Sequence, residues 1–175
     1  VLNLSKNKFL SLFLSHRIRK GNASTEAIEP FLRELIGNKK IEKLPIYFTA
    51  VATDLRSGKE VFIDKGDLVK AILASISIPG VFNPVKMGRK LLVDGGVVDP
   101  LPQKYGQLIA DKVITVNAMP SAFKYKKESD AFDIISEAVG IMSHELVRLS
   151  TIPSERIIFV QLHTNYLDPF DFTHV

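Results

Sequence analysis

Two kinds of hydrophobic pattern alternate along the chain. Apolar residues recur at spacings of three and four in residues 28–36 and, most regularly, in residues 132–149, which predicts two amphipathic helices. Three runs rich in β-branched and aromatic residues predict strands, and the first two are apolar on both alternating faces, as in strands buried on both sides. These runs are residues 46–54, 112–118 and 156–162.

Turn and capping residues place shorter elements between these segments. Ser57-Gly58 predicts a hairpin whose second strand covers residues 60–63. Asp67 is expected to cap a short helix that Pro79-Gly80 must end, and Met87-Gly88 forms a turn between two short strands. Strands that alternate with helices in this way predict a three-layer α/β/α fold, in which a mainly parallel sheet lies between helices.

The composition suits one soluble globular domain over residues 1–175, with 46% hydrophobic and 24% charged residues. The net charge of +4 permits an anionic membrane surface as a partner without requiring one. Basic residues gather in residues 6–20 and 124–127, which is a weak indication of such a surface. Residues 1–20 are interpreted as a core-facing helix, with a membrane-surface helix as the alternative. No basic stripe converges on one face, so we expect no nucleic-acid partner.

Several familiar catalytic and cofactor-binding patterns are missing. The sequence has no cysteine, and its four histidines are scattered, which argues against a metal site. His144-Glu145 lacks the second histidine of a zinc-protease helix, because Arg148 occupies that position. No Walker loop or dinucleotide fingerprint follows any strand. We therefore expect neither a metal nor a cofactor.

Asp94 is the most informative single residue, because it stands at the end of an apolar strand and directly before two glycines. The local string LLVDGGVV is also a strong signal for a tight hairpin turn. A two-residue turn needs only one glycine, however, and Gly96 removes a second side chain where a backbone or a ligand approaches closely. The local string alone therefore leaves both a turn and half of a catalytic site open.

Several separate strings of the chain resemble the patatin-like phospholipase family. They are ASISIPGVFNPV at residues 74–85, LLVDGGVVDPLP at residues 91–102, and LIGNKKIEKLPIYFTAVATDLRSGKEV at residues 35–61. Their order and spacing also fit the family. The resemblance implies a hydrolase that acts on acyl esters of lipids through a serine–aspartate dyad without a histidine, so its expected partner is a lipid or acyl-ester substrate.

On this resemblance, Asp94 is the catalytic proton acceptor, and Gly95 and Gly96 complete its motif. Burial beside apolar neighbours is expected to raise the pKa of the Asp94 carboxyl from its usual value of about 3.9. The family's nucleophile lies in a G-x-S-x-G segment. No serine of this chain lies between glycines at that spacing, and this includes Ser57, Ser75 and Ser77.

Two interpretations account for the missing serine. The chain is either the C-terminal part of a longer hydrolase, incomplete on its N-terminal side, or a non-catalytic interaction module that keeps the fold for binding. The start at Val1 without an initiator methionine favours the first. In both cases we expect the isolated chain to be inactive and its open sheet edges to cause self-association. Because no apolar run approaches the ~20 residues of a membrane-spanning helix, we expect a cytoplasmic location, with a peripheral membrane location as the alternative.

Overall fold

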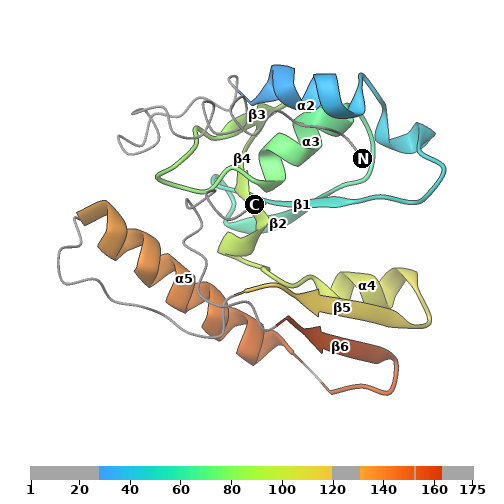
Figure 1. Ribbon diagram of the computed structural model, residues 1–175, viewed down its shortest axis with the longest axis vertical. Helices are drawn as coiled ribbons and strands as arrows, with labels where there is room; N and C mark the ends of the chain where they lie inside the picture. The colour runs from blue at the N-terminus through green and yellow to red at the C-terminus, as the bar shows by residue number, and fades with distance from the viewer. Residues whose placement is uncertain (1–27, 120–130, 152, 163–175) are drawn as a thin grey trace. The chain divides into compact units, whose positions relative to one another are not determined.

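The computed structural model describes residues 28–119, 131–151 and 153–162, which belong to two compact units (Figure 1). Unit 1 covers residues 1–98 and unit 2 covers residues 99–175. The helix expected in residues 1–20 and the basic cluster at residues 124–127 lie outside the described residues. Each unit has its own sheet, and the two units are described separately below.

Unit 1 contains a four-stranded antiparallel sheet with the strand order β2-β1-β4-β3. The strands are β1 (Ala50–Asp54), β2 (Lys59–Ile63), β3 (Val85–Met87) and β4 (Lys90–Asp94). The predicted turn at Ser57-Gly58 joins β1 to β2, and the predicted turn at Met87-Gly88 joins β3 to β4. Gly58 and Gly88 both have positive φ angles, which glycine adopts without steric cost. Both local predictions are thereby confirmed.

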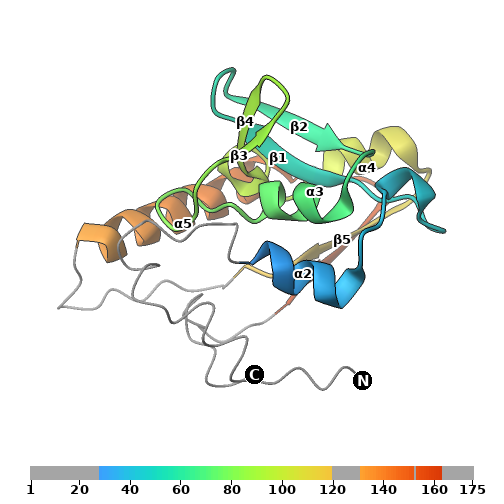
Figure 2. The same ribbon diagram turned by 90° about the horizontal axis from the view of Figure 1, so that it is seen from above.

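One helix of unit 1 packs on the sheet, and a second helix packs on the first. They are α2 (Glu29–Ile36) and α3 (Leu68–Ser75), and α3 lies between α2 and the strands β1 and β4 (Figure 2). Asp67 caps α3 as predicted, since its carboxylate accepts a hydrogen bond of 3.1 Å from the Lys70 N–H. The helix ends at Ser75, four residues before the proline that was expected to end it.

Small residues bring α3 close to the central strand. Ala52 of β1 and both Ala71 and Ala74 of α3 are fully buried. A core cluster of larger apolar side chains surrounds them: Ile41, Ile63, Leu68 and Leu92. The short 3-10 helix η2 (Ile41–Lys43) contributes Ile41 to this cluster. A buried apolar core therefore lies beneath β4, the strand that ends in Asp94.

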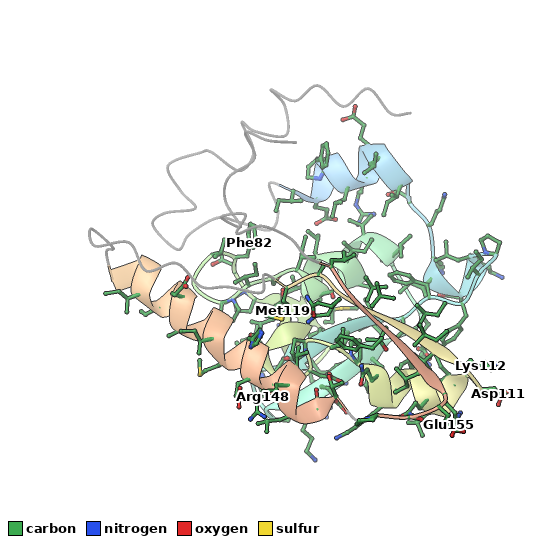
Figure 3. The ribbon with its side chains drawn as sticks, turned by 60° about the horizontal axis from the view of Figure 1, so that its bottom comes forward. Phe82, Asp111, Lys112, Met119, Arg148 and Glu155 are labelled. Atoms are coloured by element: carbon green, nitrogen blue, oxygen red, sulfur yellow. The ribbon has the colours of Figure 1, made fainter. Side chains whose placement is uncertain are left out.

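The described part of unit 2 contains two α-helices and a pair of parallel strands. They are α4 (Gln103–Ile109), β5 (Val113–Asn117), α5 (Ala131–Ser150) and β6 (Ile157–Gln161). Figure 3 shows Asp111, Lys112 and Glu155 together at the end where both strands begin, and Met119 beyond the end of β5. The Arg156 guanidinium donates to the carbonyls of Gln107, Ala110 and Asp111, which satisfies acceptors at the C-terminal end of α4.

The α/β class is confirmed, but the described strands do not form the mainly parallel sheet that the sequence predicted. Only β5 and β6 are parallel. The predicted run 46–54 forms a strand only at Ala50–Asp54, and Ile46 and Tyr47 are exposed. Strand β1 itself is central and largely buried, yet both of its neighbours are antiparallel. Burial on both faces does not determine strand direction. The tight turn between β1 and β2 fixes the direction of that pair, because a connection this short can only join antiparallel strands.

Candidate active site

Asp94 is the last residue of β4 and is held there by backbone contacts on two sides. It pairs with Ala52 of β1 in the antiparallel register. Its N–H donates a hydrogen bond of 2.9 Å to the carbonyl oxygen of Ser77, in the segment that follows α3. The sheet and the end of α3 therefore fix the backbone that carries this carboxylate.

The chain turns sharply after Asp94 into the 3-10 helix η3 (Gly95–Val97). The Asp94 side chain caps this helix, since its Oδ1 accepts a hydrogen bond of 2.7 Å from the Gly96 N–H. The Val98 N–H donates back to the Gly95 carbonyl at 3.1 Å. The hairpin alternative for LLVDGGVV is therefore wrong, because the residues after Asp94 form a helical turn and do not return as a strand paired with β4.

Gly95 lies against the backbone of β1 so closely that no other residue fits. A Cβ atom at Gly95 would lie 2.5 Å from the carbonyl oxygen and 2.9 Å from the carbonyl carbon of Val51. The Thr53 hydroxyl adds a long contact of 3.5 Å to the Gly95 carbonyl. The close backbone approach expected from the glycine pair thus occurs at the first glycine, while the second supplies the N–H that holds the carboxylate.

The environment of Asp94 raises the pKa of its carboxyl group. Burial of the half-buried side chain raises its pKa, and the hydrogen bond from the Gly96 N–H lowers it only in part. Within the described residues, the carboxylate accepts no hydrogen bond other than the one from Gly96. An oxygen of Asp94 is therefore open to a donor, and its raised pKa makes it a better proton acceptor than a free aspartate.

Asp54 lies on β1, two residues after Ala52, and its surroundings shift the carboxyl pKa in the opposite direction. Burial raises the carboxyl pKa of Asp54. Hydrogen bonds from the Leu91 N–H, the Arg56 N–H and the Ser57 hydroxyl together lower it by more, so the net pKa lies below the usual value. The Ser57 hydroxyl donates to Asp54 at 3.0 Å. The distance between these two side chains is that of a serine–aspartate dyad, but the pKa of this carboxyl is shifted in the wrong direction for a base. The lowered pKa makes this carboxylate a weaker base than that of Asp94, and the Ser57 contact lies within the turn that joins β1 to β2.

Ser77 contacts the candidate site through its backbone, and its hydroxyl has a structural partner. The residue is fully buried, and its hydroxyl donates a hydrogen bond of 2.5 Å to the Leu73 carbonyl at the end of α3. The role of Ser77 in holding the Asp94 backbone was not predicted. No sequence pattern signals it, because the contact joins residues from two different elements.

No alternative metal site appears in the part of the chain that the structure describes. No three potential ligands among histidine, aspartate and glutamate gather there. On α5, Glu145 of the rejected zinc motif forms an ion pair with Arg148, which is labelled in Figure 3. Among the described helices, none combines the length and apolar character needed to cross a bilayer.

Comparison with known proteins identifies the family to which the chain belongs. A family model described as patatin-like phospholipase matches residues 1–105, more than half of the chain. The chain belongs to the patatin-like phospholipase family, which confirms the resemblance found in the sequence.

Two relatives extend this comparison. An uncharacterized NTE family protein of Mycobacterium tuberculosis is 50% identical over 82 residues, which are 47% of this chain and 23% of that protein. A second uncharacterized NTE family protein of the same species is 40% identical over 75 residues, which are 43% of this chain and 13% of that protein. The aligned part is therefore less than a quarter of the length of either relative.

Proposed function

We propose that Asp94 is the general base of a serine–aspartate dyad in a lipid acyl hydrolase. The observation that supports this most directly is the contrast between Asp94 and Asp54. Both carboxylates lie on the paired strands β1 and β4, yet only Asp94 has a raised pKa and accepts a single hydrogen bond. The nucleophilic serine would come from a segment that these 175 residues do not contain, because the chain has no G-x-S-x-G string.

The proposed reaction uses Asp94 twice. An oxygen of its carboxylate accepts the proton of the serine hydroxyl while the serine oxygen attacks the acyl carbonyl carbon. The proton then passes to the leaving alcohol, and an acyl-enzyme remains. A water molecule attacks the acyl-enzyme, Asp94 accepts its proton, and the fatty acid is released as the serine regains a proton. The Gly96 N–H keeps the carboxylate in one orientation throughout.

The substrate class and the three-layer fold in this proposal follow from the family resemblance. The substrate class is an acyl ester of a lipid, and the complete domain adds strands and helices that build a three-layer fold around the sheet of unit 1. The enzyme is proposed to act in the cytoplasm and to meet its substrate at a membrane surface. No cofactor takes part, because the serine and the aspartate carry out every proton transfer.

The test measures esterase turnover by a full-length protein that contains this chain, on a soluble short-chain p-nitrophenyl ester. Asp94→Asn is expected to lower kcat roughly 10²- to 10⁴-fold, the usual contribution of general-base catalysis, with little change in KM. Asp54→Asn is the matched control, because it neutralises a carboxylate on the neighbouring strand that already accepts hydrogen bonds from Leu91, Arg56 and Ser57. Its kcat is expected to stay within about threefold of wild type. Normal turnover by the Asp94→Asn protein would refute the proposal.

A further inference from the structure

The segment that joins α2 to β1 carries an unusual combination of exposed residues. Its lysines Lys39, Lys40 and Lys43 are exposed, and so is Pro45. Ile46 and Tyr47 are 79% and 63% exposed, the two highest values among the large apolar side chains described in unit 1. Residues 39–47, here called the lysine tip, project from one end of unit 1 in both Figure 1 and Figure 2.

The backbone of the lysine tip is held firmly although its side chains are exposed. Ile41 is buried in the core cluster, and its N–H donates a hydrogen bond of 2.9 Å to the Gly66 carbonyl. The Gly66 N–H donates in return to the Glu42 carboxylate at 2.8 Å. Further on, the Leu68 N–H donates to the Lys39 carbonyl at 3.0 Å. The segment is therefore anchored to the N-terminal side of α3, and Ile46 and Tyr47 extend from this anchored base.

The charges of the lysine tip are mainly positive. The acidic residue within the lysine tip is Glu42, and the hydrogen bond from the Gly66 N–H is the main reason that its pKa lies below the usual value. Glu42 is thus ionised at neutral pH and occupied by a backbone donor. Three lysines against one glutamate leave the tip with a net positive charge. Single exposed apolar side chains are common on protein surfaces, but an adjacent pair that follows three lysines in the sequence matches an anionic surface with an apolar interior.

We propose that the lysine tip docks on the surface of an anionic lipid bilayer. Tyr47 and Ile46 would enter the headgroup region, where an aromatic ring with one polar end is favoured, and the lysines would face the anionic headgroups. Tyr47 precedes Ala52, the partner of Asp94, by five residues, which span at most about 18 Å of extended chain. Docking there would hold Asp94 near the lipid surface. This inference deepens the proposed function: docking would bring lipid substrate to Asp94 only if Asp94 is catalytic.

The test measures co-sedimentation of the full-length protein with vesicles of phosphatidylserine and phosphatidylcholine, and with vesicles of phosphatidylcholine alone. Each lysine near an anionic surface strengthens binding roughly fivefold, so K39Q/K40Q/K43Q is expected to weaken binding to the anionic vesicles by about 100-fold. I46S/Y47S is expected to weaken it at least about tenfold, because it removes two apolar side chains from the bilayer. The matched control K59Q/K86Q/K90Q makes the same charge change at exposed lysines on β2, β3 and β4. Its binding is expected to change by less than about threefold.

The inference is overturned if the wild-type protein does not bind the anionic vesicles, or if the tip and control lysine variants lose the same affinity. Thermal unfolding of each variant shows whether unit 1 remains folded. The Asp94→Asn protein separates this inference from the proposed function. Normal vesicle binding with lost esterase turnover supports both. If the Asp94→Asn protein retains turnover, the catalytic role of Asp94 is refuted and the docking proposal is not. If the wild-type protein needs Asp94 for turnover but does not bind the vesicles, the docking proposal is refuted and the catalytic role is not.

Discussion

Replacing Gly95 by alanine tests the contact that places Asp94 beside β1. The new Cβ atom would lie 2.5 Å from the Val51 carbonyl oxygen, about 0.9 Å closer than an ordinary contact of 3.4 Å. Val51 cannot easily move away, because β1 is paired with β2 on one side and with β4 on the other. The helix η3 must move instead. Overpacking of this kind typically costs about 1–3 kcal/mol, and we expect the upper part of that range because the obstructing atoms belong to the backbone.

Urea unfolding of the chain, followed by circular dichroism, measures this cost. We expect Gly95→Ala to lower the free energy of unfolding by about 2–3 kcal/mol, a large part of the ~5–15 kcal/mol that stabilises a typical domain. Gly106→Ala on α4 is the matched control. Its Cβ would lie 3.0 Å from a methyl carbon of Val113, whose side chain can adjust. Alanine also favours the helix over glycine by about 1 kcal/mol, so we expect this variant to be close to wild type in stability.

The same substitution should affect the candidate site. A shift of η3 moves the Gly96 N–H away from the Asp94 carboxylate, which it now contacts at 2.7 Å. A full-length Gly95→Ala protein should therefore lose esterase turnover even under conditions where it is fully folded. Unchanged urea midpoints for Gly95→Ala would refute the reasoning, since they would mean that β1 and η3 are not in rigid contact.

Three further predictions concern pH, activity and association. The folded pKa of Asp94 lies above that of the unfolded chain, so wild-type stability should fall as pH rises from about 3.9 through the folded pKa. Asp94→Asn removes this fall, so urea unfolding should show that the variant gains more stability relative to wild type at pH 8 than at pH 3. An equal difference in stability at both pH values would contradict the raised pKa. A fluorophosphonate serine probe should not label the isolated 175-residue chain, and labelling would show an active serine within it. The isolated chain should also self-associate, because Ile114, Val116, Ile158 and Val160 expose one apolar face of the β5–β6 pair; light scattering of a monomer at micromolar concentration would refute this.

Features set by neighbouring residues could be predicted from the sequence. The turns at Ser57-Gly58 and Met87-Gly88, the cap at Asp67 and the long helix α5 all occur where the pattern placed them. Glycines with positive φ and a carboxylate before a helix act within a few residues of chain. The position of Asp94 at the end of a strand was likewise a local feature, and the family motif around it was read directly from the residues.

Tertiary structure decided which of these local features could carry chemistry. The antiparallel direction of β1 and β4 places Asp94 opposite Ala52, and the approach of Val51 to Gly95 turns the chain into η3. Burial and hydrogen-bond partners then give Asp94 a raised pKa and Asp54 a lowered one. The two aspartates have the same side chain at the ends of two paired strands. Their proton affinities differ because desolvation and hydrogen bonding depend on atoms that are distant in sequence and adjacent only in the folded chain.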